Sequence, residues 1–220
     1  MRIYCERDTL GWFAEPLNTV SGLAFFISAW QAWRQLERAR LREQWDLHLL
    51  AWLIGLIGLA SVLWHASGIG WLHWFDAAAV AAFVLVYWQV FLVRVSQLRW
   101  PGLLVGWLVT GAGVALFYLL LPQIFLGSTL AYTPLLALLL AGIVLSARID
   151  RRLARDLLLA SGLFVLAMVV RAADLLLCEW VIVGTHWLWH LLTAGLLFVL
   201  VDGMIRHVRL RETRVGNDVA

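Results

Sequence analysis

Long apolar runs alternate with short polar and charged segments along the whole chain. The apolar runs cover residues 19–36, 47–66, 72–95, 102–121, 130–147, 153–173 and 184–205. Each run is long enough to cross the ~30 Å hydrocarbon core of a bilayer as a helix. Charged segments such as RQLERARLREQWD and ARIDRRLARD separate the runs, as helix boundaries should. The pattern predicts an all-α integral membrane protein with seven transmembrane helices.

The composition agrees with a membrane protein. The chain has 220 residues, of which 63% are hydrophobic and 14 are tryptophan, and a soluble domain of this length would have difficulty burying them. The first 18 residues are polar and lack the apolar core of a secretory signal. We therefore expect an N-terminal extracytoplasmic segment over 1–18, a seven-helix domain over 19–205 and a cytoplasmic tail over 206–220.

The basic residues are all arginines, and their distribution predicts the orientation in the membrane. Of the 17, only Arg2, Arg7 and Arg171 lie outside the first, third and fifth loops and the tail. The positive-inside rule then places the N-terminus outside and the C-terminus inside. Topology thus accounts for the net charge of +3, and no nucleic-acid partner is needed.

Several polar residues fall at one depth, near the outer ends of three predicted helices. Ser61 and His65 lie one turn apart where the second helix ends, and Asp76 lies about one turn into the third helix. The seventh helix opens with THWLWH, so His186 and His190 share one of its faces. Ionisable groups at membrane depth are functional candidates, because they are costly there unless they are paired.

Three imidazoles with an open fourth position are the ligand set of a catalytic zinc site. We therefore predict that His65, His186 and His190 bind Zn²⁺. A bound zinc ion lowers the pKa of its water and polarises a carbonyl group. Asp76 would accept the proton of that water and pass it to a leaving amine, and Ser61 would donate a hydrogen bond to the developing oxyanion.

Each residue also has a simpler structural interpretation, and other functional classes remain open. Histidines at helix ends are often interfacial anchors, as we expect for His48, His73 and His207. A serine such as Ser61 often only packs or bonds to the backbone. The alternatives to hydrolysis are a receptor or signalling protein in which zinc is only structural, a haem-binding electron carrier and, with least support, a transporter.

Cys5 and Cys178 both fall on the predicted outer side, where disulfides persist. Their position is compatible with a disulfide and equally with two unrelated cysteines. Asp174 lies three residues after Arg171, and this spacing suggests a structural ion pair.

The motifs together resemble a known family. They are the N-terminal stretch YCERDTLGWFAEPLNTVSGLAFF, which contains E-x-x-N-T-x-S; S-x-x-x-H in SVLWH; an aspartate eleven residues after that histidine; and H-x-x-x-H in the last helix. In these features the chain resembles the alkaline ceramidases. That family is part of a superfamily of seven-helix membrane hydrolases that also holds the adiponectin and progestin receptors.

The resemblance implies an intramembrane zinc amidase that cleaves ceramide-like lipids into a sphingoid base and a fatty acid. It implies the same zinc ligands and the same roles for Ser61 and Asp76, and it favours a disulfide between the two cysteines. It also implies a Ca²⁺ site at Glu6, Asp8 and Glu15, since hard oxygen ligands suit calcium. Short loops, the absence of lysine and tryptophan-rich outer ends suit a bacterial inner membrane, with the site near the periplasmic face.

Overall fold

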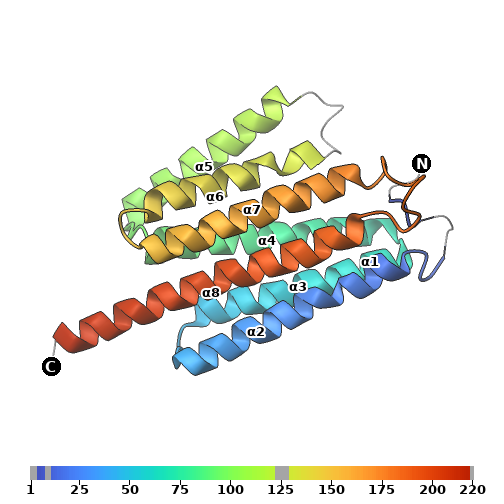
Figure 1. Ribbon diagram of the computed structural model, residues 1–220. Helices are drawn as coiled ribbons and strands as arrows, with labels where there is room; N and C mark the ends of the chain where they lie inside the picture. Colours follow the sequence, from blue (N-terminus) through green and yellow to red (C-terminus); the bar gives the residue numbers. More distant parts are fainter. Residues whose placement is uncertain (1–3, 8–10, 122–128, 219–220) are drawn as a thin grey trace.

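The computed structural model describes residues 4–7, 11–121 and 129–218, and this part of the chain is helical, with no strand. Figure 1 shows the elements in order. They are α1 (Pro16–Ser21), α2 (Leu23–Ala39), α3 (Trp45–Ser67), α4 (Gly70–Arg94), α5 (Trp100–Leu120), the short 3₁₀ helix η2 (Thr129–Tyr132), α6 (Thr133–Ser146), α7 (Arg151–Ala173) and α8 (His186–Asp218).

Six segments in the described part of the chain are long and apolar enough to cross a membrane. They are α3, α4, α5, the run from η2 through α6, α7 and most of α8. The first predicted span begins earlier than expected and is divided at Gly22 into α1 and α2, and neither piece is among these six segments. The first predicted span, and with it the total of seven, therefore stays a prediction.

The helices run side by side, and the two ends of the chain lie at opposite ends of the bundle (Figure 1). The N-terminal segment, the α3–α4 connection and the α7–α8 connection share one end. This arrangement brings the start of α8, the end of α3 and the first residues of the chain together. Residues 206–218 of the predicted tail continue α8 as a helix, and its C-terminal end extends past the neighbouring helices (Figure 1).

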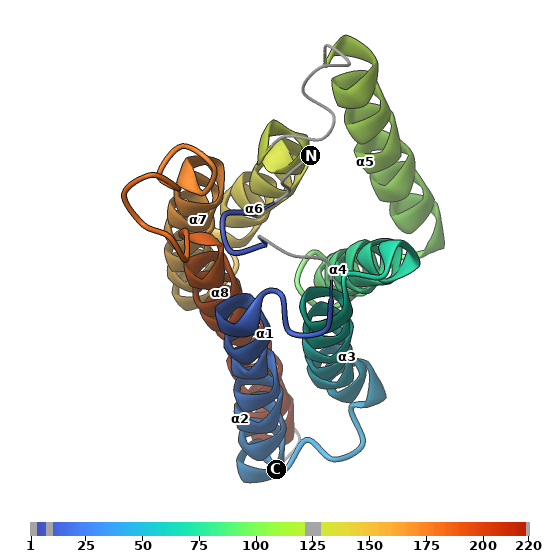
Figure 2. The same ribbon diagram turned by 90° about the vertical axis from the view of Figure 1, so that its right-hand side faces the viewer.

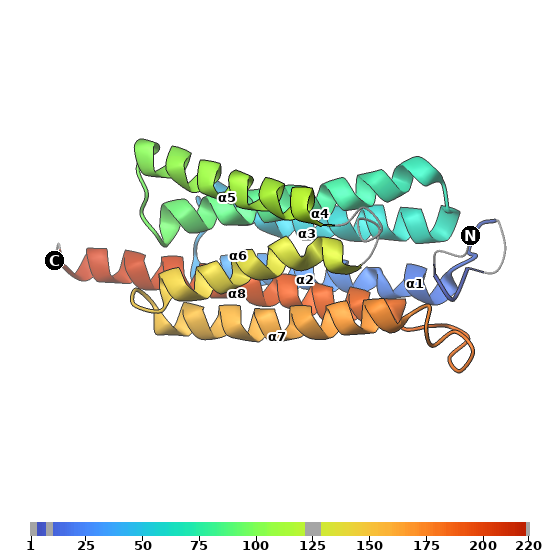
Figure 3. The ribbon, with the colours of Figure 1, turned by 90° about the horizontal axis from the view of Figure 1, so that it is seen from above.

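The most extensive helix contacts are those of α7 with α8, of α3 with α4 and of α2 with α3. At Gly58 the helices α2 and α3 approach so closely that an added Cβ would lie 3.0 Å from the Cβ of Phe25. In contrast, α5 lies at the outside of the bundle next to α4 (Figures 2 and 3). It buries none of its residues, as suits a helix whose apolar side chains face lipid.

Candidate metal centre

Three histidines meet at the end of the bundle that carries the N-terminal segment. His65 comes from the last turn of α3, and His186 and His190 come from the first two turns of α8. All three are buried, and one ring nitrogen from each lies within 4.8 Å of the other two. This arrangement could hold one metal ion, as the S-x-x-x-H and H-x-x-x-H spacings predicted.

Two of the rings are held through their Nδ1 atoms. The Nδ1 of His65 lies 2.5 Å from a carboxylate oxygen of Glu15. The Nδ1 of His190 lies 3.0 Å from the carbonyl oxygen of Asn18 and 2.8 Å from the hydroxyl of Ser21. Metal-binding histidines commonly donate the N–H of one ring nitrogen in this way, which fixes the ring and leaves the other nitrogen for the metal. The donor set therefore fits a zinc ion.

The Nδ1 of His186 has no hydrogen-bond partner in the described part of the chain. The ring is instead covered by Tyr4, which stacks on it at a centroid distance of 4.1 Å. A buried ring nitrogen without a partner is costly, because desolvation is not repaid. A bound metal or a hydrogen-bonding ligand would satisfy it.

Glu15 is fully buried directly before α1 and joins several of these groups. It pairs with the Nε of Arg7 and accepts a 3.0 Å hydrogen bond from the side-chain amide of Asn18. Burial alone would raise the pKa of Glu15, but the hydrogen bond and charge of His65, with Asn18 and Arg7, lower it below its usual value. The carboxylate is therefore ionised at neutral pH.

Asp174 fixes the start of α8. Its carboxylate accepts hydrogen bonds from the backbone N–H groups of Thr185 at 2.6 Å, His186 at 2.9 Å and Cys5 at 3.0 Å. The predicted pairing of Asp174 with Arg171 is thus wrong: the orphan N–H groups at the start of a helix are better partners for a buried carboxylate. Cys5 also forms a disulfide with Cys178, which ties the N-terminal segment to the α7–α8 connection.

The calcium site predicted in this segment gains no support in the described part of the chain and stays a prediction. The two carboxylate oxygens of Glu6 accept the backbone N–H groups of Leu17 and Asn18, at 2.6 and 2.8 Å. Glu15 is engaged with Arg7 and His65, and Asp8 lies outside the described residues. The guanidinium of Arg7, 4.7 Å from the centre of the Trp64 ring, already supplies a cation beside Glu15.

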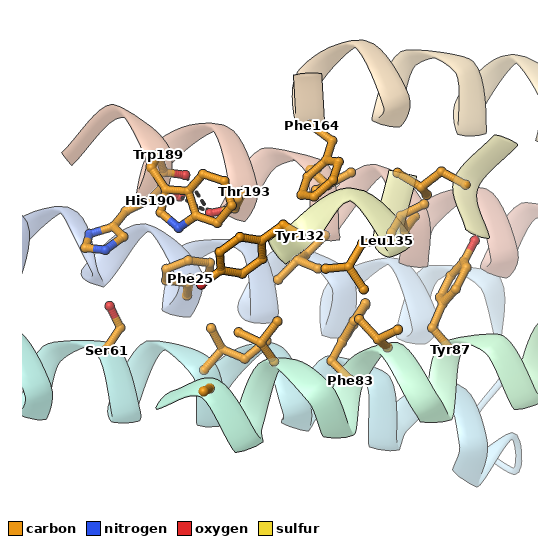
Figure 4. A pocket seen from close by; sticks show the side chains of 18 of the residues that line it. Phe25, Ser61, Phe83, Tyr87, Tyr132, Leu135, Phe164, Trp189, His190 and Thr193 are labelled. Carbon is orange, nitrogen blue, oxygen red and sulfur yellow. Dashed lines mark hydrogen bonds between the residues drawn. The ribbon is translucent and has the colours of Figure 1, made fainter. Parts of the chain in front are cut away.

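A cavity of ≈ 190 Å³ opens beside the histidines and extends along the inside of the bundle (Figure 4). Its polar end is formed by Ser61, His73, Asp76, Arg171, His186 and His190. The rest is almost entirely apolar and reaches Leu200 on α8, about 15 Å beyond His190 at 1.5 Å per residue. In Figure 4, Phe83, Leu135 and Tyr87 lie toward the end away from His190.

The two residues predicted to act on the substrate lie at the polar end of this cavity. The hydroxyl of Ser61 is buried and has no hydrogen-bond partner in the described part of the chain. Asp76 is half-buried on α4 and lines the same space. His73, expected to be only an interfacial anchor, also lines the cavity.

Sequence reasoning missed the residues that hold the ligands in place. Glu15, Asn18 and Ser21 all belong to the E-x-x-N-T-x-S motif, and each contacts a metal-site histidine. The motif was therefore the signal that could have identified these residues, but the resemblance implied that its glutamate, Glu15, binds calcium. No spacing in the sequence pointed to Asp174 as a helix cap.

One comparison with known proteins identifies the family. The family model described as Ceramidase matches residues 4–216, which is nearly the whole chain and includes the N-terminal segment, the three histidines, Ser61 and Asp76. No curated protein and no solved structure matches the chain. The extent of the family match shows that this chain belongs to the ceramidase family.

Proposed function

We propose that this protein is an intramembrane, zinc-dependent amidohydrolase that cleaves ceramide-like lipids into a sphingoid base and a fatty acid. His65, His186 and His190 would hold the zinc ion. The observation that carries the proposal is that three buried histidines cluster, two of them lining a largely apolar cavity, inside a bundle of membrane-type helices. Such a cavity suits a long acyl chain, and its polar end suits the amide group.

When bound, zinc would activate a water molecule and polarise the amide carbonyl. Asp76, which lines the same cavity, would accept a proton from the attacking water and give it to the amine that leaves. Ser61 would donate a hydrogen bond to the carbonyl oxygen as negative charge develops there. The C–N bond breaks, the hydroxyl group stays on the acyl carbon, and the amine leaves with the added proton.

The lipid would enter sideways from the bilayer. Residues of α4 and α6 both line the cavity, but the two helices do not pack closely against each other. We infer that the acyl chain passes between them. In this proposal α1 and α2 together form the first of seven spans. The metal centre lies near the outer face, which in a bacterium is the periplasmic face of the inner membrane.

The geometry gives the rival functions less support. A haem would need two of the imidazoles on opposite sides of a porphyrin, whereas the three ring nitrogens here gather around one point. A purely structural zinc would give no task to Ser61, whose buried hydroxyl lacks a partner in the described part of the chain.

Metal content tests the proposed site. Protein purified in detergent should hold one zinc ion per chain, as measured by mass spectrometry. His186→Ala and His190→Ala should lose it, because two nitrogens cannot replace three at a buried site. His48→Ala is the matched control: His48 packs on Trp33 in α2, away from the metal centre, and its loss should leave the zinc in place. Folded wild-type protein that takes up no zinc when zinc is in excess would refute the proposal.

A further inference from the structure

Arg171 is a basic residue in an unusual place. It lies in the last turn of α7 and is the one arginine or lysine among the described residues that line the cavity. An arginine at membrane depth is costly unless an anion or a hydrogen-bond acceptor compensates its charge. The residues around it should therefore reveal what it binds.

Aromatic rings hold the guanidinium at the wall of the cavity. Its central carbon lies 5.1 Å from the centre of the Tyr132 ring and 5.4 Å from that of Trp189. Cation–π contacts of this kind stabilise and orient an arginine without neutralising it. The side chain is thus fixed beside the polar end of the cavity, near the Tyr4 that covers His186.

The charge of Arg171 is not neutralised by a neighbouring carboxylate in the described part of the chain. Its buried Nε has no hydrogen-bond acceptor, and no carboxylate lies within the 4.0 Å of an ion pair. The guanidinium interacts with the hydroxyl of Tyr4 and, at longer range, with the carboxylate of Asp76. Asp174, the nearest acidic residue in sequence, is engaged with the start of α8.

We propose that Arg171 binds a carboxylate group of the lipid in this cavity. The planar fork of N–H donors in a guanidinium matches the two oxygens of a carboxylate, and Arg171 presents that fork beside the metal centre. The identity of the lipid as an amide rests on the function proposed above; the carboxylate site does not. The carboxylate has two possible sources: an acidic head group on the amine side of the substrate, as in an N-acyl amino acid, or the fatty acid that hydrolysis releases.

Binding measurements with two matched pairs of lipids distinguish the sources. N-palmitoylglycine is compared with its neutral carboxamide, and palmitic acid with hexadecanol, by competition against a fluorescent acyl probe on zinc-loaded wild-type protein. In the pair whose carboxylate Arg171 binds, Arg171→Gln should lower the affinity for the acid by about 10- to 100-fold. The affinity for the neutral lipid of that pair should not change. Arg171→Lys, which keeps the charge but not the fork, should fall in between.

Controls keep the test decisive. Arg155→Gln removes an exposed arginine from the other end of α7 and should change neither preference. A selective loss of affinity for N-palmitoylglycine shows that Arg171 binds an acidic head group. A selective loss of affinity for palmitic acid shows that it binds the fatty acid product. If Arg171→Gln and Arg171→Lys both bind every lipid as wild type does, the proposal is overturned. Because binding needs no turnover, a failure of hydrolysis would be seen separately.

Discussion

Glu15 joins the N-terminal segment to the metal centre through one carboxylate. One oxygen faces Arg7, and the other faces the Nδ1 of His65 and the side-chain amide of Asn18. A carboxylate behind a metal-binding histidine orients the ring and raises its basicity. Glu15 would therefore act on a bound metal through its neighbour, a role that the sequence resemblance did not suggest.

Replacing Glu15 by glutamine should weaken zinc binding. The amide keeps the shape of the side chain but removes the charge that supports His65, and we expect the affinity for zinc to fall by about 10- to 100-fold. Competition with a zinc chelator measures this change. Glu37→Gln, at an exposed residue whose carboxylate accepts a hydrogen bond from Trp33, is the control and should bind zinc as wild type does. Equal affinities in all three proteins would show that Glu15 has no part in the metal centre.

Arg7 already supplies the positive charge that a calcium ion would bring to Glu15. We therefore expect the thermal unfolding temperature of wild-type protein to be the same with calcium and with a calcium chelator. Arg7→Ala leaves the buried carboxylate without its partner and should cost about 3 kcal/mol of stability. A wild-type protein that becomes clearly more stable on adding calcium would contradict this interpretation of the N-terminal segment.

At the scale of the elements, the start of α8 depends on a carboxylate from another segment. Asp174→Ala would leave three backbone N–H groups without their acceptor, and we expect the free energy of unfolding to fall by about 3 kcal/mol. Zinc binding should also weaken, because one of these N–H groups belongs to His186. Thermal unfolding and zinc titration measure the two effects.

The matched control for this variant lies at the opposite end of the bundle. Asp150 caps α7 through the N–H groups of Arg152 and Leu153. Asp150→Ala removes this cap and the contact of Asp150 with the Nδ1 of buried His207, and should cost about 1 to 3 kcal/mol and leave zinc binding unchanged. If Asp174→Ala also kept full zinc affinity, the cap would serve stability alone.

Hydropathy predicted the positions of the helices well but not their ends. The last apolar run stops at residue 205, yet α8 continues because Arg206 and His207 still pair with Asp156 and Asp150 of the α7 region. Hydropathy also did not predict the division of the first run at Gly22, because a short break in a helix does not change the mean hydropathy of a long window.

At the scale of the whole molecule, the site is assembled from the two ends of the sequence. Ser21 and His190 are 169 residues apart, and Cys5 is joined to Cys178. Periodicity could place the three histidines at one depth, because each lies at a predictable height on its own helix. It could not show which side chains meet across the bundle, and so the partners of the ligands and the course of the cavity became visible only in the structure.

The most direct test of the proposed function is the release of fatty acid from a ceramide, measured together with zinc content on wild-type protein and Asp76→Asn. We predict that both proteins hold one zinc ion per chain, because Asp76 is not one of the proposed zinc ligands. Turnover should fall at least about 100-fold in the variant, since the proton acceptor is lost. Unchanged turnover in Asp76→Asn, or no turnover of any ceramide by wild-type protein that holds its zinc, would contradict the account.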